Sequence, residues 1–174
     1  MANENSAANY STELITEAEV IAAQIEWGEG IVHIGKVFTD KGDYVKAASD
    51  HIETLYGYDI SMVLFKPTLA STHQFRNTHD AALSYFVGGN PTYQEDKGFA
   101  IKPWTKVRWE NVGIINGNSN MAIAMGNYYF TPKAADNEKV AEVKVEYTFG
   151  YVKDREGKLR IVVHKSSLPF DPTK

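Results

Sequence analysis

Cysteine is absent from this chain of 174 residues. Without thiols, the chain can form neither disulfides nor thiolate zinc sites nor iron–sulfur clusters, so it does not need an oxidising compartment. It also lacks an apolar run long enough for a membrane-spanning helix, and residues 1–11 lack the basic stretch and apolar run of a signal peptide. We therefore expect no membrane association and a cytoplasmic location.

Basic residues do not outnumber acidic ones in this chain. The formal net charge is -4 and the isoelectric point is near 5.7, so the chain has no basic field that would attract a phosphate backbone, and we expect no nucleic-acid partner. No phosphate loop or dinucleotide fingerprint is present. The length suits one domain, and we assign a polar tail to residues 1–11 and a single domain to residues 12–170.

The first part of the chain has the periodicity of helices. From Thr12 onwards apolar residues recur at spacings of three and four, and Ser11 or Thr12 followed by Glu13 and Glu17 would supply a cap and an acidic first turn. We predict that this stripe faces the core. It consists of Leu14, Ile15, Ala18, Ile21, Ala22, Ile25 and Val32.

Two shorter helices are predicted further on. Residues 43–55 have one apolar side and are followed by Gly57, and residues 78–87 are capped by Asn77 or Thr78 and end at Gly88 and Gly89. Short strands are predicted at residues 60–66 and 74–77, and a covering loop at residues 90–103.

The second part of the chain is nearly continuous strand. Four strands separated by short turns must be antiparallel neighbours, and helices followed by such a meander indicate an α+β domain. Glycines inside strands allow a sheet to bend. The strands are predicted at residues 104–115, 121–131, 140–153 and 158–168, and the glycines are Gly113, Gly126 and Gly150.

This element order is similar to that of the cone-shaped nuclear-transport-factor-2-like fold. In that fold a strongly bent antiparallel sheet wraps around a long N-terminal helix and leaves a pocket between them. We therefore expect one small pocket inside the cone.

The last strand contains the most informative residues. With a period of two, His164 and Ser166 share one face, while Val163, Lys165 and Ser167 share the other. An imidazole can exchange a proton near neutral pH, and a neighbouring hydroxyl can orient a water or bind an oxyanion. The alternative is an ordinary strand histidine bonded to a neighbour, and composition alone does not decide between the two.

Motifs of other catalytic classes are lacking. Ser84 and Ser166 do not lie in a nucleophile elbow. The histidines form neither a His-x-His pair nor an HExxH helix, which leaves open only a zinc site assembled from distant positions. These histidines are His33, His51, His73, His79 and His164. We interpret the aromatic residues Trp27, Trp104, Trp109, Tyr128, Tyr129 and Phe130 as packing residues.

Several segments together resemble the iota-class carbonic anhydrases, a class related to the association domain of calcium/calmodulin-dependent kinase II. The resemblance covers about residues 58–169. It is carried by the segments LFKPTLAS (64–71), HQFRNT (73–78), ALSYFVGGN (82–90), EDKGFAIKPWTKVRWEN (95–111), AMGNYYFT (124–131) and VVHKSSLP (162–169).

The resemblance implies interconversion of carbon dioxide and bicarbonate, in some members without metal or other cofactor. The family's threonine, tyrosine, histidine and serine match Thr68, Tyr85, His164 and Ser166, which we expect to be catalytic, with Thr72 or Thr105 as alternatives for the threonine. Many relatives read His-His-Ser-Ser where this chain has Lys165 as the second residue, which argues against a metal. Further expected substrate-binding residues are Tyr58, Arg76, Thr72 and Ser167.

Two alternatives share the fold. An isomerase, dehydratase or cyclase would need a carboxylate base, for which Asp80 and Glu110 are the candidates. A non-catalytic oligomerisation or ligand-binding module would be favoured by a pocket filled with aromatic side chains. We also expect a homodimer, formed through an exposed apolar sheet face. The residues assigned to that face are Val112, Ile114, Tyr147, Phe149 and Tyr151.

Overall fold

The computed structural model describes residues 9–134 and 140–173. These residues form three α-helices, one short 3-10 helix and a five-stranded sheet with the strand order β1-β5-β4-β3-β2. The elements are α1 (Glu17–Thr39), α2 (Tyr44–Leu55), β1 (Leu64–Lys66), α3 (His79–Val87), η2 (Pro91–Tyr93), β2 (Trp104–Ile115), β3 (Met121–Pro132), β4 (Val143–Lys153) and β5 (Leu159–Ser167).

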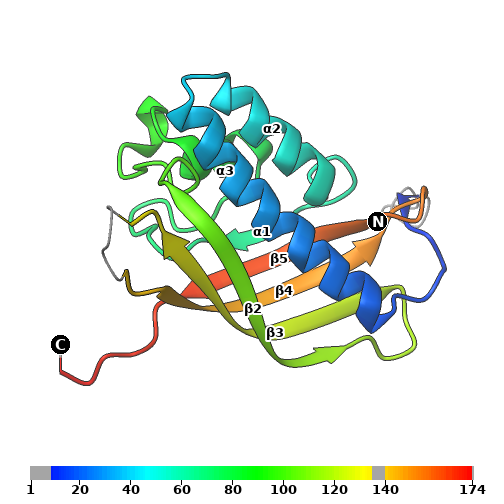
Figure 1. Cartoon of the computed structure of the whole chain (residues 1–174). Helices are drawn as coiled ribbons and strands as arrows, with labels where there is room; N and C mark the ends of the chain where they lie inside the picture. Colours follow the sequence, from blue (N-terminus) through cyan, green and yellow to red (C-terminus); the bar gives the residue numbers. More distant parts are fainter. Residues whose placement is uncertain (1–8, 135–139, 174) are drawn as a thin grey trace.

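The sheet is bent around α1, which lies across its concave side, while α2 lies beside the C-terminal half of that helix and α3 packs against α2 (Figure 1). Strands β2 to β5 form an antiparallel meander, whereas β1 joins β5 in parallel. The predicted α+β cone is confirmed. The parallel strand was not predicted, because the sequence gives no direct sign of which strand the isolated β1 joins.

A bulge between Asn111 and Gly113 and a register shift at Gly150 mark the bends. Gly126 is required at the first of them, because a Cβ there would lie 2.1 Å from the carbonyl oxygen of Glu110. Two of the three glycines predicted to allow bending, Gly113 and Gly150, therefore lie at irregular pairings. The third, Gly126, pairs with Asn111 at the bulge.

Helix α1 begins later than predicted. Its N-cap is Thr16, whose hydroxyl accepts from the backbone N–H of Glu19, while the Glu19 carboxylate accepts from the backbone N–H of Thr16 at 2.7 Å. This reciprocal pair is a capping box. The expected cap at Ser11 or Thr12 is wrong, because the Ser11 hydroxyl instead accepts from the N–H of Glu13 in a turn before the helix.

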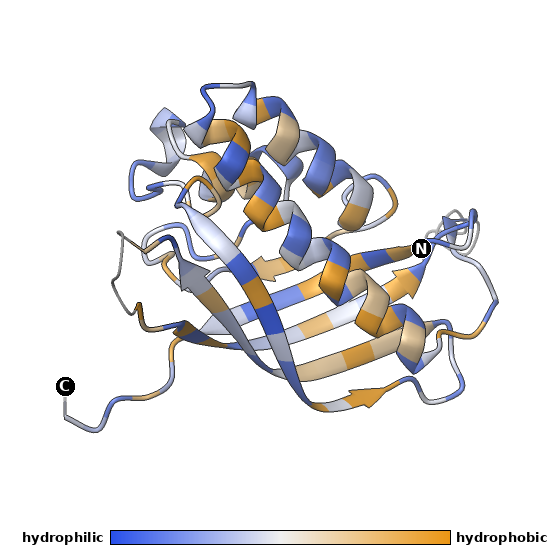
Figure 2. Cartoon of the chain, viewed as in Figure 1, coloured by the Kyte–Doolittle hydropathy of each residue, from blue (hydrophilic) through white to orange (hydrophobic). Residues whose placement is uncertain are grey.

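The predicted apolar stripe of α1 has the wrong phase. Ile21 and Ile25 are exposed, and Figure 2 shows that hydrophobic residues are not confined to the inner side of this helix. The sheet lies so close that a Cβ on Gly28 would be 3.0 Å from Cβ of Val107, so small residues as well as large apolar ones occupy the inner face. That face consists of Val20, Gln24, Trp27, Gly28, Ile31, Ile34 and Gly35.

The other helices match their predictions closely. Asp43 caps α2, and Thr78 caps α3, which ends at Gly88 with a φ of 72°. The strand expected at residues 60–66 is reduced to Leu64–Lys66, and residues 74–77 form no strand. That segment is held instead by a single backbone bond from Arg76 N–H to the carbonyl oxygen of Phe65, at 2.8 Å.

The start of the described chain also packs on the sheet. Tyr10 forms an isolated bridge with Asp154, and the N–H of Ser11 donates to the carbonyl oxygen of Lys153 at 3.0 Å. Contacts with the sheet therefore begin within residues 1–11, the part assigned to the tail. None of the helices within residues 9–134 and 140–173 is long and apolar enough to span a bilayer.

Candidate active site

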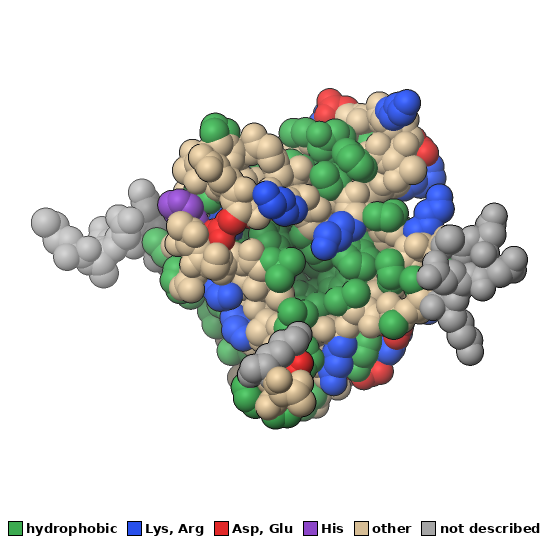
Figure 3. Space-filling view, turned by 90° about the vertical axis from the view of Figure 1, so that its left-hand side faces the viewer, with side chains coloured by type: hydrophobic (Ala, Val, Ile, Leu, Met, Phe, Trp, Pro, Cys, Tyr) green, Lys and Arg blue, Asp and Glu red, His purple; other side chains and the backbone are tan. Residues whose placement is uncertain are grey.

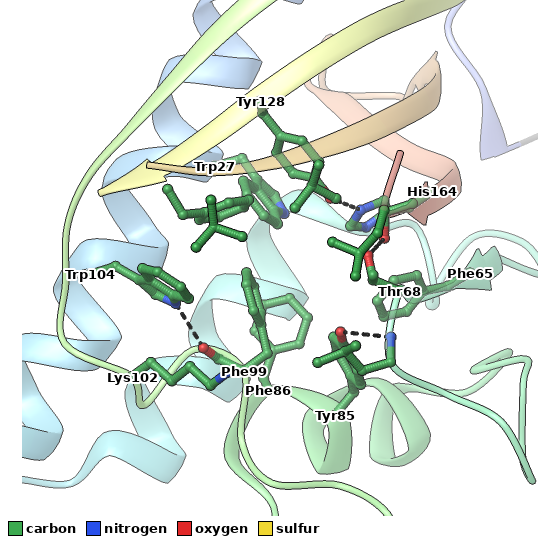
Figure 4. A pocket seen from close by; sticks show the side chains of 16 residues that line it. Trp27, Phe65, Thr68, Tyr85, Phe86, Phe99, Lys102, Trp104, Tyr128 and His164 are labelled. Carbon is green, nitrogen blue, oxygen red and sulfur yellow. Dashed lines mark hydrogen bonds between the residues drawn. The ribbon is translucent and has the colours of Figure 1, made fainter. Parts of the chain in front are cut away.

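A cavity of about 190 Å³ lies inside the cone, between the sheet, α3 and the C-terminal half of α1. Its mouth is a hollow lined by hydrophobic side chains, with basic side chains beside it (Figure 3). A cavity of this size has room for several water molecules. It is lined by Trp27, Phe65, Thr68, Leu69, Tyr85, Phe86, Phe99, Lys102, Trp104, Tyr128, Phe130, Val143, Val145, His164, Ser166 and Leu168 (Figure 4).

The polar groups gather on one side of this otherwise apolar cavity. Along β5 the side chains alternate, so His164 and Ser166 point inward and are buried, whereas Lys165 is exposed on the outer face. Strand β1 runs parallel to β5 with Phe65 opposite His164, and the chain just beyond β1 brings Thr68 next to Ser166. The Thr68 hydroxyl donates to the Ser166 hydroxyl at 2.9 Å.

The imidazole of His164 has contacts on both ring faces and at both ring nitrogens. Its ring stacks between Phe65 and Phe149, with centroid distances of 4.6 and 4.1 Å. The Tyr56 hydroxyl lies 2.9 Å from Nδ1 and the Tyr128 hydroxyl 3.3 Å from Nε2. Burial lowers the pKa of His164 to about 3, so the ring is neutral at physiological pH.

Tyr85 approaches the cavity from α3. Its hydroxyl oxygen accepts from the backbone N–H of Leu69 at 3.4 Å, which leaves its own hydrogen free for the cavity. Burial raises the pKa of Tyr85 to about 12, and burial likewise raises the pKa of Tyr128 above its usual value. Both tyrosines therefore remain hydrogen-bond donors across the neutral range.

The four residues expected to be catalytic, Thr68, Tyr85, His164 and Ser166, thus all line one cavity. Neither alternative threonine is among the lining residues. Thr105 lies on β2, where its hydroxyl donates to the carbonyl oxygen of Thr131. Thr72 is exposed on the segment that follows β1.

The four residues expected to bind substrate are not in the cavity lining. Besides the exposed Thr72, Ser167 lies on the outer face of β5 and donates to Glu146 at 2.9 Å. The Tyr58 hydroxyl is used by a bond to the carbonyl oxygen of Arg76 at 2.7 Å. Period-two alternation explains Ser167, because adjacent strand residues face opposite sides of a sheet.

Arg76 is fully buried in an ionic cluster outside the cavity. Its guanidinium donates to both oxygens of Asp96, at 2.7 and 2.8 Å. Glu95 completes the cluster by accepting backbone N–H bonds from Ser71, Thr72 and His73. We call Arg76, Glu95 and Asp96 the clamp, because they fasten the segment after β1 to the loop after α3. The guanidinium of Arg76 bonds with Asp96 and with the carbonyl oxygens of His73 and Ala81, and Arg76 is not among the residues that line the cavity.

The bonds from these backbone N–H groups, that of Thr72 first, lower the pKa of Glu95 to about 2. The carboxylate is therefore ionised throughout the neutral range. It holds in place the loop that carries Leu69 at the cavity edge.

Trp27, Tyr56 and Tyr128 were missed as residues of the site. Packing was the predicted role of four aromatic residues that belong to the hydrophobic core and also line the cavity: Trp27, Trp104, Tyr128 and Phe130. The indole N–H of Trp27 donates to the Tyr56 hydroxyl at 2.9 Å. One property of these residues could have pointed to the site: a buried tyrosine or tryptophan usually needs a hydrogen-bond partner for its polar atom.

The structure does not favour the two alternative functions. Asp80 is exposed on α3, and Glu110 is exposed and paired with Arg108 and Tyr129. In the described chain, the residues that line the cavity include no Asp or Glu, so the base needed by an isomerase or dehydratase is missing there. The aromatic side chains line the cavity without filling it, which removes the observation that would have favoured a purely non-catalytic module.

Metal ligands are not grouped in the part of the chain that the structure describes, where no three His, Asp or Glu residues could hold an ion together. Lys165, which stands where many relatives have a second histidine, is exposed and donates to the Ser167 hydroxyl at 2.7 Å. A histidine at this position would point away from the cavity.

The expected dimer face needs correction. Tyr147, Phe149 and Tyr151 are buried on the inner face of β4, and Ile114 points to the same side. Both faces of these strands are rich in apolar residues, so the sequence pattern did not show which face is exposed. Among the described residues, the exposed apolar side chains of the outer face are Val112, Ile115, Met121, Ile123 and Met125.

Fold and site together define a class: an α+β cone whose cavity presents hydroxyl groups and a neutral imidazole within apolar walls. Comparison with known proteins gives that class a family. The family model described as metal-independent carbonic anhydrase matches residues 18–168. A metal-independent carbonic anhydrase from Nostoc sp. is 45% identical over 161 residues, which are 90% of this chain and 75% of the relative.

Solved structures agree. The crystal structure of the iota-carbonic anhydrase from a cyanobacterium, complexed with bicarbonate, is 43% identical, with a TM-score of 0.86 over 92% of this chain and 96% of the other. A putative calcium/calmodulin-dependent protein kinase II association domain from Xanthomonas campestris is similar in fold, with a TM-score of 0.58 at 21% identity over 95% and 98% of the two chains. This chain belongs to the metal-independent carbonic anhydrase family.

Proposed function

We propose that this carbonic anhydrase hydrates carbon dioxide with a water molecule held by the hydroxyl groups of Thr68, Ser166 and Tyr85, while neutral His164 acts through Tyr128. The observation that carries this proposal is the meeting of Thr68 and Ser166, 2.9 Å apart, beside a buried imidazole in an otherwise apolar cavity. The cyanobacterial relative was solved with bicarbonate, which supports carbon dioxide and bicarbonate as the substrate pair.

The apolar walls suit an uncharged substrate. Carbon dioxide carries no charge, so aromatic and aliphatic side chains can surround it without a desolvation penalty. Bicarbonate is an anion, and an apolar cavity holds an anion poorly. Lys102 is the single cationic side chain among the described residues that line the cavity, and we propose that it attracts the bicarbonate that forms when the product reaches bulk water.

A hydroxyl relay accounts for the protons. The water oxygen bonds to the carbon while an electron pair of one carbon–oxygen double bond moves to its oxygen. The water passes a proton to Thr68, Thr68 passes its own to Ser166, and Ser166 passes its own to that substrate oxygen. The product is carbonic acid, which ionises once it reaches bulk water, and both hydroxyls end as they began.

This relay needs no base, which fits the cavity. His164 has its pKa lowered to about 3 by burial, so it is a poor base at neutral pH, and both of its ring nitrogens already have tyrosine partners. Tyr85 donates to the second substrate oxygen, which shares part of the negative charge that develops before Ser166 has passed its proton to the first. Oriented donors of this kind replace the charge that a zinc ion supplies in other carbonic anhydrases.

The test is carbon dioxide hydration by stopped flow on Thr68→Val, Tyr85→Phe and Ser166→Ala. Each removes one hydroxyl and is expected to lower turnover about 100-fold, the typical effect of losing one donor aimed at a developing charge. Ser49→Ala removes a half-buried hydroxyl on α2 that bonds with Glu53 and His79 outside the cavity, and it serves as the control. Full activity in all three cavity variants would refute the assignment.

We also propose a homodimer formed through the outer face of β2 and β3. Val112 is 83% exposed there and Met125 is 55% exposed, and apolar side chains that gather on one face of a sheet are typical of self-association. Light scattering should show a mass of two chains for the natural sequence and a lower mass for Met125→Lys. A monomer at micromolar concentration would contradict the proposal.

A further inference from the structure

The ring of His164 has two tyrosine partners, Tyr56 and Tyr128. The direction of the hydrogen bond with Tyr56 is fixed by Trp27, which also bonds to the Tyr56 hydroxyl. The indole N–H of Trp27 can only donate. It donates to the Tyr56 hydroxyl oxygen at 2.9 Å, and this oxygen also lies 2.9 Å from Nδ1 of His164. The three residues come from α1, from the end of α2 and from β5.

The hydrogen of Tyr56 must therefore go to His164. Its oxygen already accepts from Trp27, and Nδ1 is the other partner of this buried hydroxyl among the described residues. Nδ1 is then an acceptor without a proton. Because a neutral imidazole carries one proton, that proton is on Nε2, which faces the Tyr128 hydroxyl oxygen at 3.3 Å.

The opposite tautomer is disfavoured by burial. With a proton on Nδ1, the oxygen of Tyr56 would accept from both Trp27 and His164, and its own hydrogen would have no acceptor among the described residues. Tyr56 is almost completely buried, so this hydrogen could not turn to bulk water. A buried donor without a partner is costly, and folded proteins avoid it.

The hydrogen bonds continue to donate in the same direction, toward the cavity. The Tyr128 oxygen accepts from Nε2–H, so its own hydrogen is free for the cavity that Tyr128 lines. Ser166, which lines the same cavity, accepts from Thr68 at 2.9 Å. The bond that the Tyr128 oxygen accepts strengthens its own donation.

We propose that Trp27, Tyr56, His164 and Tyr128 form a one-way hydrogen-bond chain that fixes Tyr128 as a donor into the cavity, to a substrate oxygen. Tyr56 is a positioning residue in this chain, because it acts through His164 and Tyr128. The proposal rests on the proposed function for the identity of that oxygen. The direction of the chain does not depend on it.

The direct test is the protonation of the His164 ring in the full chain. Long-range ¹⁵N–¹H correlation spectra of protein with labelled histidine distinguish a protonated ring nitrogen from a bare one, and His164→Asn assigns the signals. We expect a bare Nδ1 and a protonated Nε2 near neutral pH. A protonated Nδ1 would overturn the proposal, and this measurement does not depend on the folding of any tyrosine variant.

The second test is Tyr56→Phe, which removes the hydrogen that Nδ1 accepts. We expect the ring to lose its single tautomer and turnover to fall about 10- to 100-fold, the usual loss when a partner one step behind a reacting group is removed. The Michaelis constant should change less, because the apolar walls that receive carbon dioxide are unchanged. Unchanged turnover with an unchanged tautomer would also refute the chain.

Tyr147→Phe is the matched control. Tyr147 is another buried tyrosine on the inner face of the sheet, but its hydroxyl bonds with Gln24 and Asn111, away from His164. Its removal should leave the His164 spectrum and the turnover within about twofold, since no partner of the ring is lost. A natural chain without hydration activity would refute the proposed function, whereas the tautomer would still be measurable and would still decide the direction of the chain.

Discussion

The cavity and the clamp are two buried polar regions built on opposite principles. The clamp pairs full charges, with Arg76 and Asp96 both entirely buried and joined at 2.7 and 2.8 Å. The cavity has hydroxyls and a neutral imidazole, and its hydrogen bonds can change partners. Charged pairs hold a fixed geometry, whereas neutral hydroxyls can both donate and accept, which a proton relay requires. Substitutions in the clamp should therefore unfold the protein, and those in the cavity should inactivate it.

The largest effect is expected from Asp96→Ala. It removes the carboxylate that accepts two bonds from the buried guanidinium of Arg76 and leaves only Glu95, 3.5 Å away, as a charged partner, which should lower the free energy of unfolding by about 3–5 kcal/mol. Denaturation by urea measures this change. The control is Asp50→Ala, which removes an exposed ion pair with Lys46, and exposed pairs contribute little. If the two variants unfolded at the same urea concentration, the structural role of the clamp would be wrong.

Ser166→Ala should show the opposite pattern. We expect turnover to fall about 100-fold through loss of the donor at the substrate oxygen, while the urea midpoint stays close to that of the natural chain. Ser167→Ala is the sharpest comparison, because it removes a hydroxyl one residue further along the same strand but on the outer face. Turnover within about twofold of the natural chain is expected there. Equal losses in both variants would contradict the inward and outward assignment.

Acid should destabilise the cavity region before it affects the clamp. The unfolded chain binds a proton at His164 below pH about 6.5, but the folded chain does not until about 3, so stability falls as pH falls through this window. The slope approaches about 1.4 kcal/mol per pH unit for one such histidine. Urea unfolding at pH 6 and pH 5 measures it.

His164→Asn should reduce this slope, and a slope that the substitution leaves unchanged would show that the ring is not the source. Glu95 behaves differently. Its pKa is lowered to about 2, so its contribution is complete above pH 4.5 and is lost only as the pH falls toward 2.

The smallest expected effect is that of pH on hydration. His164 with its pKa lowered to about 3 and Tyr85 with its pKa raised to about 12 do not titrate between pH 6 and 9. The rate constant for hydration should therefore be nearly flat across this range. A zinc-bound water would give a rise with a pKa near 7. A sigmoidal profile centred near neutrality would contradict a relay made of neutral groups.

The elements with local signals could be predicted from the sequence. The cap Thr78, the strand Trp104–Ile115 and the alternation of His164 and Ser166 depend on neighbours along the chain. The phase of α1 could not be predicted, because its inner face is decided by how closely β2 approaches Gly28.

The partners of His164 could not be predicted from the sequence for a similar reason. Tyr128 lies on β3, which is separated from β5 by the whole of β4, so the two side chains meet only because the sheet is strongly bent. Tyr56 follows α2 and is more than 100 positions from the ring that it contacts. A tyrosine on the inner face of a strand predicts a polar partner but does not identify it.

The most direct test of the account is the rate of carbon dioxide hydration by chelator-treated protein, measured by stopped flow, with the metal content of the same sample determined by elemental analysis. The account predicts that activity persists when the metal content is far below one ion per chain, and that added zinc does not raise it. Activity that disappears with the chelator and returns only with zinc would contradict it.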